Sequence, residues 1–276
     1  MYIAIITDFG YKDPYVGIMQ SVMLQAEPEL RFIDLTQDIS PFDIRSASYV
    51  LASAWPYLPP GTVVLLVVDP GVGSARRELI AARDGKFIVA PDNGAVSLLE
   101  HTAGPLSCHR ARPELLEELE GLRPGFARTF DGRDLFSPLA GRIASQGLDA
   151  VAGEEVEPLR LDDLGVRRRD APEGPVLEGH VVHRDRFGNV VTTITAADLE
   201  AFRGASDAGE LTARLHTGGH GRWVRAALGR TFSDVEPGAP LAYLGSAGFL
   251  ELALREGDFA KTLGVQQKHI VELIRE

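Results

Sequence analysis

Three aspartates stand at the ends of short apolar runs in the sequence. Asp8, Asp69 and Asp92 each follow aliphatic and β-branched residues that are typical of a buried strand. A carboxylate can accept hydrogen bonds from hydroxyl groups, pair with a cation or take a proton from water. Because ligands of open α/β sheets bind outside the carboxyl ends of the strands, these positions predict a polar site at one sheet edge.

The segment that begins at Asp69 concentrates ionisable side chains in a short loop. Residues 69–77 read Asp-Pro-Gly-Val-Gly-Ser-Ala-Arg-Arg. A turn this tight can bring the Asp69 carboxylate to the Arg76 guanidinium, either as a structural ion pair or as part of a site. Gly71 and Gly73 suit the turn because glycine allows positive φ. The third glycine of a dinucleotide motif and the lysine of a P-loop are missing, which disfavours phosphate binding.

Two further segments carry charges at short spacing. Thr129–Asp134 reads Thr-Phe-Asp-Gly-Arg-Asp and precedes a predicted helix over Leu135–Gln146, whose dipole favours a carboxylate near its start. Asp185–Asn189 reads Asp-Arg-Phe-Gly-Asn, a composition typical of a β-turn. Neither segment alone distinguishes a solvated loop from a functional one.

The elements that must position these residues alternate between strands and helices in the N-terminal part. The spacing of apolar residues predicts helices over Pro14–Ala26 and Asp43–Leu58, each between strand-like runs. This β-α-β-α-β order predicts an N-terminal α/β domain over 1–165 with an open, mainly parallel sheet. A composition shift with two prolines predicts a linker over about 166–175.

The C-terminal part is patterned differently. Short strand-like runs separated by glycine turns predict a smaller, all-β, barrel-like domain over 176–276, built as an antiparallel sheet or barrel. The runs are Val176–His183, Val190–Thr195, Leu211–His216, Arg222–Ala227, Leu241–Gly245 and Phe249–Leu254.

Composition disfavours several classes of protein. The 276 residues carry a formal net charge of −11, which disfavours nucleic acid as a partner. The longest purely aliphatic run, Val63–Val68, is far shorter than a membrane span, and the first strand lacks a basic leader, so we expect neither membrane insertion nor secretion. The single cysteine, Cys108, excludes an internal disulfide framework and favours a cytoplasmic location.

Metal and serine-hydrolase chemistry are disfavoured as well. The histidines include the pairs His180/His183 and His216/His220, but no cysteine or carboxylate pattern completes a zinc signature. The Gly-x-Ser-x-Gly turn of serine hydrolases is missing from the sequence. We therefore expect no metal.

Taken in order along the chain, these segments and several others resemble the S-adenosylmethionine hydroxide adenosyltransferases, a family related to the fluorinase and the chlorinase. The agreement runs over nearly the whole chain, which makes it far more specific than any single motif. The matching segments are Thr7–Gly10, Asp13–Gly17, Val68–Ser74 with Arg76, Pro91–Gly94, Thr129–Asp134, Asp185–Asn189 and Gly245–Glu251.

The resemblance implies a fold, an assembly and a reaction. It implies an N-terminal α/β domain, a C-terminal barrel-like domain and a homotrimer, with each site between one subunit's N-terminal domain and its neighbour's C-terminal domain. The implied reaction is attack of water or hydroxide on the ribose 5′ carbon of the substrate S-adenosylmethionine, which releases adenosine and methionine. The resemblance implies no cofactor besides this substrate. A sulfonium is already a good leaving group, so catalysis needs water held in line with the C–S bond and near a base.

In the family, an aspartate, an arginine and a histidine surround the attacking water. The corresponding positions here are Asp69, Arg76 and Asp131. Asp131 departs from the family pattern Thr-Phe-His-Gly-Arg-Asp, so two carboxylates would share one arginine. We expect activity to survive, in weakened form, because Asp69 and Arg76 are retained.

The substrate-binding residues implied by the resemblance lie in both domains. Asp8 would accept hydrogen bonds from the ribose hydroxyls, and Phe42 would line the ribose or the base. Asn189 offers a donor and an acceptor to the adenine edge, and Phe187 would stack near it. The methionine part is assigned to Asp185 for its ammonium group and to Ser246, with Glu251 and the Leu254 backbone beside them. A serine of the halogenase methionine pocket falls at Tyr15, which departs from that pattern.

The residues leave three alternatives to this hydrolase. The halogenases carry tyrosine at the position of Asp69, and a carboxylate beside the nucleophile would repel halide, so water is favoured over a halide-using adenosyl transfer. Loss of the family histidine at Asp131 suits a protein that binds S-adenosylmethionine or adenosine with little or no turnover. The third alternative is a nucleotide-binding α/β protein unrelated to this family.

Overall fold

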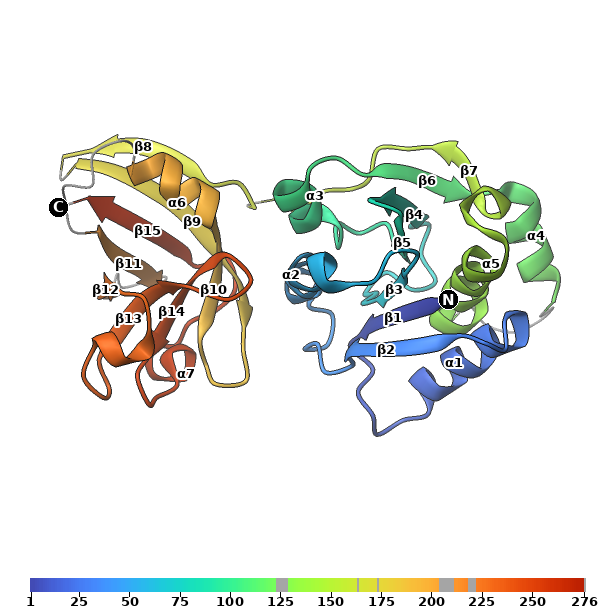
Figure 1. The fold of residues 1–276 in the computed structure, drawn as a ribbon, viewed down its shortest axis with the longest axis horizontal. Coiled ribbons are helices and arrows are strands. Elements are labelled where there is room, and N and C mark those ends of the chain that lie inside the picture. The colour runs from blue at the N-terminus through green and yellow to red at the C-terminus, as the bar shows by residue number, and fades with distance from the viewer. Residues whose placement is uncertain (123–128, 163, 173, 204–210, 218–221, 276) are drawn as a thin grey trace. The chain divides into compact units, whose positions relative to one another are not determined.

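The chain folds into two compact units (Figure 1). The computed structural model describes residues 1–122, 129–162, 164–172, 174–203, 211–217 and 222–275. The first unit spans Met1–Leu161 and the second spans Asp162–Glu276. No helix within these described residues is long and apolar enough to cross a membrane.

The first unit is built on a seven-stranded sheet. In spatial order its strands are β2 (Arg31–Thr36), β1 (Tyr2–Thr7), β3 (Val63–Val67), β5 (Lys86–Pro91), β4 (Glu78–Arg83), β6 (Ser107–Ala111) and β7 (Ala152–Glu155). The first four run parallel, whereas β4, β6 and β7 join by antiparallel pairing. The expected mainly parallel α/β sheet is thus parallel over one half, because β4 and β5 form a hairpin through Asp84 and Gly85 instead of a helical crossover.

Helices cover both faces of this sheet (Figure 1). α1 (Tyr15–Ala26) and α5 (Ser137–Gln146) pack together on one face, where Met19, Leu139 and Ile5 belong to the same buried core. α2 (Ile44–Ala54) contacts β1 and α3 (Ser97–Ala103) on the other face. The remaining helical segments are the 3-10 turns η1 (Trp55–Tyr57) and η3 (Leu148–Ala150), the helix α4 (Pro113–Gly121) and the π-helical turn η2 (Gly132–Phe136).

Local signals set the limits of α2. The Asp43 side chain accepts a hydrogen bond from the Ser46 N–H at 2.9 Å, which satisfies one of the unpaired donors at the start of the helix. The pattern that predicts a helix as far as Leu58 continues beyond α2 only as the 3-10 turn η1. Pro59 and Pro60 follow and cannot extend a helix because proline lacks an N–H.

The parallel strands β1, β3 and β5 end at the same edge of the sheet. Thr7, the last residue of β1, pairs with Val67, the last residue of β3. Asp8 directly follows β1, Asp69 follows β3 after one residue, and Asp92 directly follows β5. All three aspartates therefore leave the sheet at its carboxyl edge.

The second unit is an eight-stranded sheet, seven strands of which close into a barrel. Most neighbours pair antiparallel, but β12 and β13 are parallel. Pairing of β9 with β10 closes the barrel, and β8 adds to the far side of β9. In spatial order the strands are β10 (Val190–Thr195), β14 (Phe249–Leu254), β13 (Pro240–Leu244), β12 (Arg222–Leu228), β11 (Leu211–Thr217), β15 (Ile270–Arg275), β9 (Gly174–Arg184) and β8 (Arg167–Ala171).

The second unit differs in two features from the predicted linker followed by an all-β domain. β8 lies within the segment 166–175 that the composition predicts as a linker, because its backbone pairs with the start of β9. The barrel also carries two short helices, α6 (Ala196–Arg203) and α7 (Phe259–Leu263), which bury Phe202 and Phe259 in its core. Helices this short show too little periodicity to be separated from strand-like runs in a sequence.

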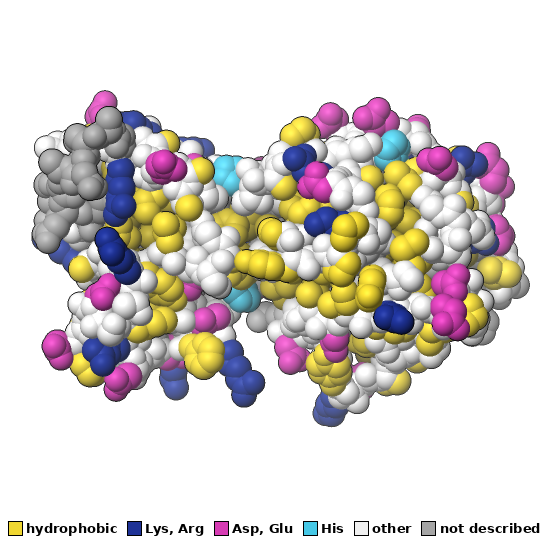
Figure 2. Space-filling model, in the orientation of Figure 1, with side chains coloured by type: hydrophobic (Ala, Val, Ile, Leu, Met, Phe, Trp, Pro, Cys, Tyr) yellow, Lys and Arg dark blue, Asp and Glu magenta, His cyan; other side chains and the backbone are white. Residues whose placement is uncertain are grey.

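The surface of the first unit mixes charges of both signs. On the face drawn in Figure 2, acidic and basic side chains are interspersed among apolar and neutral ones over this unit. Such mixing is typical of a solvated surface.

Candidate functional site

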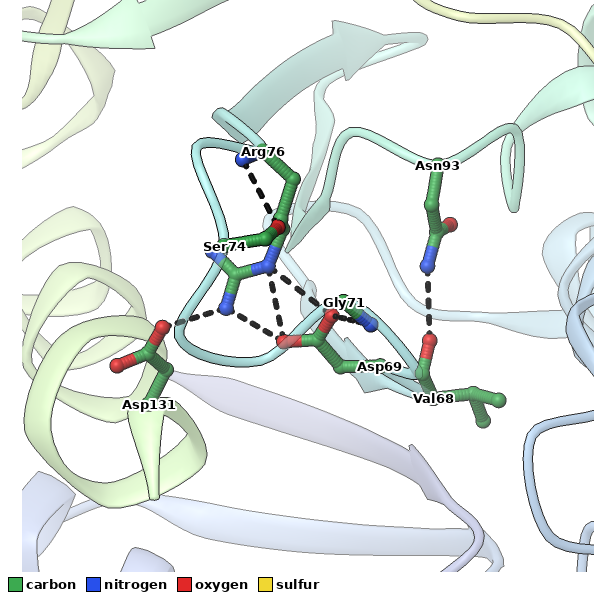
Figure 3. A network of polar contacts seen from close by, with 7 residues as sticks. All are labelled: Val68, Asp69, Gly71, Ser74, Arg76, Asn93 and Asp131. Atoms are coloured by element: carbon green, nitrogen blue, oxygen red, sulfur yellow. Dashed lines mark hydrogen bonds and ion pairs between the residues drawn. The ribbon is translucent and has the colours of Figure 1, made fainter. Parts of the chain in front are cut away.

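An aspartate and an arginine form a close ion pair in the loop after β3 (Figure 3). Arg76 Nε lies 3.0 Å and 2.9 Å from the two carboxylate oxygens of Asp69, and Arg76 Nη2 donates to Asp69 Oδ2 at 2.5 Å. The two side chains are only 10% and 6% exposed. A charge-assisted contact through two guanidinium nitrogens fixes the plane of the guanidinium as well as its position.

A second carboxylate reaches the same arginine from a distant part of the chain. Asp131 Oδ2 lies 2.5 Å from Arg76 Nη2, and its side chain is also buried. Asp131 directly precedes η2, which leads into α5. The first unit thus brings together Asp69, Arg76 and Asp131, the residues that the family resemblance predicts to surround the attacking water (Figure 3). We call these three residues the acid–arginine cluster.

The backbone of the loop holds the ion pair in place. The Gly71 N–H donates to Asp69 Oδ1 at 3.2 Å, and the Arg76 N–H donates to Ser74 Oγ at 3.2 Å. A Cβ atom on Gly71 would lie 3.2 Å from Arg76 Cγ and 3.4 Å from Ser74 Oγ. Because these contacts are tighter than ordinary packing, glycine at this position lets the loop fold closely around Asp69 and Arg76.

Asp8 lies at the same sheet edge and is half-buried. Its Oδ2 accepts a hydrogen bond from the Phe42 N–H at 2.8 Å. Burial raises the pKa of Asp8 and the negative charge of Asp69 adds to this increase, whereas the hydrogen bond from Phe42 opposes it. Hydroxyl groups that donate to this carboxylate would stabilise its charged form, so the position suits a sugar diol.

The backbone of Phe42 adopts a conformation that is rare for an aromatic residue. Its φ is +68°, in the left-handed region, and the residue is 68% exposed. The hydrogen bond to Asp8 on one side and the cap residue Asp43 on the other hold this conformation. Backbone outliers of this kind concentrate at ligand sites. Phe42 therefore holds Asp8 through its backbone N–H while its aromatic ring is exposed to solvent.

Asp92, the third aspartate at this edge, is engaged in structural contacts. Its Oδ2 accepts from Arg77 Nε at 3.0 Å and from Arg77 Nη2 at 2.5 Å, while its Oδ1 accepts from the Leu159 N–H at 2.7 Å. The neighbouring Asn93 donates to the Val68 carbonyl at 2.8 Å, at the end of β3 (Figure 3). Asp92 therefore ties the segment around Leu159 to the sheet.

In the second unit, the turn between β9 and β10 carries three of the predicted substrate-binding residues. Asp185 Oδ1 accepts from the N–H groups of Phe187 at 2.9 Å and Asn189 at 2.8 Å, and Asp185 Oδ2 accepts from Asn189 Nδ2 at 2.8 Å. Asn189 is buried, whereas Phe187 is 77% exposed. These are the local hydrogen bonds of the β-turn that the composition predicts. The turn leaves the Phe187 ring exposed to solvent.

Glu251 supplies another carboxylate close to Asp185. The Tyr243 hydroxyl donates to Glu251 Oε2 at 2.6 Å, and a Cβ on Gly245 would lie only 1.8 Å from Glu251 Oε1. Burial raises the pKa of Glu251 and the charge of Asp185 raises it further, although the hydrogen bond from Tyr243 acts in the opposite direction. A half-buried carboxylate next to a second one favours a positively charged ligand, such as an ammonium group.

The last two predicted residues of this unit differ in exposure. Ser246 is exposed in the turn between β13 and β14. The Leu254 side chain packs against the barrel core, so only its backbone fits a ligand contact. Tyr243 is a residue that the sequence did not single out. It faces Glu251 because the two pair in register across β13 and β14, a relation that becomes visible only when the strand pairing is known.

The predicted residues thus form two groups, one in each unit. The group in the first unit has an excess of carboxylates over guanidinium groups, since Asp8 lies near a cluster in which two carboxylates share Arg76. This excess favours a cationic ligand and disfavours halide. Within the described residues, no group of three or more His, Cys, Asp or Glu side chains is arranged to hold a metal ion.

Comparison with known protein families gives one match for each unit. Residues 3–152 match the SAM hydroxide adenosyltransferase N-terminal domain, and residues 179–272 match the SAM hydroxide adenosyltransferase C-terminal domain. The two matched ranges contain all of the predicted site residues of both groups.

Individual proteins agree with the chain over nearly its full length. A protein named (R)-S-adenosyl-L-methionine hydrolase from Thermus thermophilus is 39% identical over 272 residues, which is 98% of each chain. A protein of the same name from Salinispora tropica is 37% identical and aligns with 96% of this chain and 94% of its own. The crystal structure of an uncharacterized conserved protein from Thermotoga maritima, 30% identical, superposes with a TM-score of 0.81 and covers 99% of this chain and 100% of its own.

Proposed function

The chain belongs to the SAM hydroxide adenosyltransferase family, and from this premise we propose that it is an enzyme that hydrolyses S-adenosylmethionine to adenosine and methionine. The observation that carries the proposal is the buried acid–arginine cluster at the carboxyl edge of the sheet. Relatives named as hydrolases of this substrate align with almost the whole chain. Because the alignments span nearly the full length of these relatives, they support assigning the same overall reaction to this chain.

The reaction is a displacement at the 5′ carbon of the ribose. The water oxygen forms a bond to this carbon while the bond from the carbon to sulfur breaks. The electron pair of the broken bond stays on sulfur, so the sulfonium becomes the neutral thioether of methionine. The attacking water gives up one proton to a carboxylate of the cluster and from there to solvent. The enzyme must hold the water in line with the breaking bond and improve it as a nucleophile.

The acid–arginine cluster is suited to both tasks. Asp69 accepts a hydrogen bond from the water and orients its lone pair toward the 5′ carbon. Arg76 fixes the plane of the Asp69 carboxylate through two nitrogens and ties Asp131 to the same centre. Because these side chains are buried, their charges act in a medium of low dielectric constant, where preorganised groups are most effective.

The charge of the cluster also selects the reactants. Its two carboxylates and one guanidinium leave one net negative formal charge, which attracts a sulfonium cation. The same charge repels chloride and fluoride. The cluster therefore favours water over halide as the nucleophile.

Each part of the substrate has a matching group in the two units. The ribose hydroxyls donate to Asp8, and Phe42 covers the ribose or the base. In the second unit Asn189 pairs with the adenine edge and Phe187 stacks near it. The carboxylates of Asp185 and Glu251 take the methionine ammonium group, while Ser246 and the Leu254 backbone contact the rest of the methionine part.

We assign the assembly to a homotrimer in which each site combines the first unit of one subunit with the second unit of its neighbour. Each half of the site displays an exposed aromatic ring beside charged groups, Phe42 in the first unit and Phe187 in the second. Apolar rings exposed in this setting are typical of surfaces that bind a ligand or a partner. A site closed by a neighbour would cover both rings.

The reaction needs no cofactor, because water is the only co-reactant and the sulfonium leaves without activation. The proposed location is the cytoplasm, where a lone thiol such as Cys108 stays reduced.

The test is to incubate the purified protein with S-adenosylmethionine, with and without chloride, and to follow adenosine, methionine and halogenated nucleoside by chromatography. We expect equal adenosine release in both buffers and its loss in Asp69→Ala. A folded protein that binds adenosine in calorimetry but releases no product would replace hydrolysis with a binding role. A halogenated nucleoside would replace it with halide transfer.

A further inference from the structure

An aromatic ring lies against the arginine of the acid–arginine cluster. Arg76 Cζ lies 4.9 Å from the centroid of the Phe136 ring, within the range of a cation–π contact. Phe136 is fully buried and belongs to the core between α1, α5 and the sheet. The carboxylates bind the guanidinium through its N–H groups, whereas the ring contacts the guanidinium carbon. Phe136 therefore adds a restraint that neither Asp69 nor Asp131 provides.

The π-helical turn η2 explains how one short segment supplies both a carboxylate and a ring to Arg76. The Ser137 N–H donates to the Gly132 carbonyl five residues earlier, and Ser137 Oγ donates to the same carbonyl at 2.6 Å. In a regular α-helix, Asp131 and Phe136 would point about 140° apart around the axis. The wider turn brings residues five apart onto one side, and both contact Arg76. Turns of this kind are frequent at functional sites.

We propose that Phe136 is a positioning residue for the hydrolysis, placed by η2 so that its ring holds the Arg76 guanidinium in the plane that serves both carboxylates. The inference rests on the proposed function. Phe136 is buried beneath the cluster and acts on the reaction through Arg76. If the ring is lost, the guanidinium can tilt, and the Asp69 carboxylate that directs the water then loses its fixed orientation.

Loss of the ring should lower kcat and leave KM nearly unchanged. The cluster acts on the attacking water, whereas the assigned substrate contacts are made by other residues. We expect Phe136→Leu to lower kcat about 10-fold with KM within about twofold of the unaltered protein, in line with a desolvated cation–π contact. Phe87→Leu is the matched control, because Phe87 packs against the same core from β5. It should keep both constants.

A graded replacement separates the electronic effect from packing. Phenylalanine analogues with one, two or three ring fluorines at position 136 keep the shape of the side chain while they weaken the negative face of the ring. We expect kcat to fall stepwise with each fluorine while the thermal midpoint of unfolding stays constant. A ring that only fills space would give the same kcat across the series, and that result would overturn the proposal.

Nuclear magnetic resonance of the arginine Nε–H groups gives a readout that does not depend on turnover. A ring packed on the Arg76 guanidinium shifts its Nε–H signal, and this shift should disappear in Phe136→Leu but persist in Phe87→Leu. If the unaltered protein releases no adenosine, the proposed function fails while the signal still decides whether Phe136 restrains Arg76. If the protein is active and Phe136→Leu matches Phe87→Leu in kcat and in the signal, the positioning role is wrong.

Discussion

Arg76 is the residue on which the chemistry of the first unit converges. It contacts two carboxylates through its nitrogens and a buried ring through its carbon, and two of these partners, Asp131 and Phe136, come from the same short segment. Asp131 occupies the place where the family pattern has histidine, and here its carboxylate forms an ion pair with Arg76. An aspartate at this position therefore keeps a polar partner for the arginine while it changes the charge of the cluster.

Asp131 should contribute to turnover through this ion pair. We expect Asp131→Ala to lower kcat about 10-fold, because Arg76 loses a charged hydrogen-bond acceptor and the cluster loses one negative charge. Asp131→His restores the residue of the family pattern and should give a rate at least equal to that of the unaltered protein. Initial rates of adenosine release for the three proteins check this. A rate unchanged in Asp131→Ala would remove Asp131 from the reaction.

Glu251 should make substrate recognition sensitive to acid. Its pKa is raised by burial and by the charge of Asp185, so it gains a proton at a higher pH than an ordinary glutamate. As the pH falls through that pKa, the carboxylate becomes neutral and its attraction for the substrate ammonium group disappears. We expect kcat/KM to fall along an acid limb that lies above the usual range of glutamate.

A variant can shift this acid limb in a known direction. Tyr243 donates a hydrogen bond to Glu251, and this bond lowers the pKa of the carboxylate. Removal of the hydroxyl in Tyr243→Phe should therefore move the acid limb of kcat/KM to higher pH, while Glu251→Gln should abolish the limb. A profile of kcat/KM that is the same in all three proteins would show that Glu251 does not contact the substrate.

At the scale of elements, the turn between β9 and β10 depends on a glycine. Gly188 has a φ of +87°, and a Cβ atom there would lie 2.3 Å from Asp258 Cγ and 2.8 Å from Asp258 Cα. The turn that carries Asp185 and Asn189 can therefore pack against the start of α7 only without a side chain at this position. The placement of Asp185 and Asn189, which belong to the proposed substrate site, thus depends on a residue that has no side chain.

Gly188→Ala should destabilise the protein by about 2–4 kcal/mol, because the positive φ and the collision with Asp258 act together. Gly238→Ala is the control, since Gly238 has a φ of +79° but nothing within 4 Å of the added Cβ. Gly238→Ala should lower the free energy of unfolding by about 1–2 kcal/mol, which is the cost of placing alanine in the left-handed conformation. Urea-induced unfolding of both variants measures the difference. Equal losses in the two variants would mean that Asp258 moves aside freely.

The sequence predicts elements and contacts that are local, and it misses those that depend on distant pairing. The helix predicted over Pro14–Ala26 is α1, and the contact between Asp69 and Arg76 follows from seven-residue spacing across a glycine-rich turn. The hairpin of β4 and β5 has a local signal, the Asp84-Gly85 turn, which the prediction of a mainly parallel sheet did not use. The contact of the Phe136 ring with Arg76 has no local signal, because it requires a partner whose position is set only by the packed fold.

For the candidate site, the family resemblance predicts which distant residues come together, whereas the periodicity of the sequence does not. Asp131 is 55 positions from Arg76 in the sequence, and no local pattern relates the two. The contacts to the methionine part are the least determined, because a serine of the halogenase methionine pocket falls at Tyr15 in this chain. Tyr243 emerges there only through its register with Glu251.

At the scale of the whole molecule, the two groups of site residues lie in different units, so their combination can be tested by mixing. Asp69→Asn inactivates the half-site of the first unit, and Asn189→Ala weakens that of the second. If each site is shared between neighbours, co-expression of the two variants should restore roughly a quarter of the sites, because random assembly pairs two intact halves at that frequency. Adenosine release from the co-purified assembly measures this recovery.

The matched control for mixing is a double variant that carries both changes in one chain, co-expressed with the unaltered chain at equal ratio. It should retain a similar share of active sites if halves are exchanged between neighbours. If every site is built within one chain, the two single variants give no recovery on mixing, and the shared-site assembly is wrong.

The strand β8 has a consequence for how the protein behaves at high concentration. Closure of the barrel pairs both edges of seven strands, so within the described residues the outer edge of β8 is the open edge of this sheet. Arg167 and Arg168 follow one another on that strand and are exposed, whereas the next residue, Arg169, is paired with Glu178 and Glu272. Unpaired strand edges are templates for association between chains, and the like charges of Arg167 and Arg168 repel a second copy of the same edge. Replacing these two arginines with apolar residues would favour aggregation while leaving the acid–arginine cluster intact, so resistance to aggregation depends on residues other than those proposed to carry the reaction.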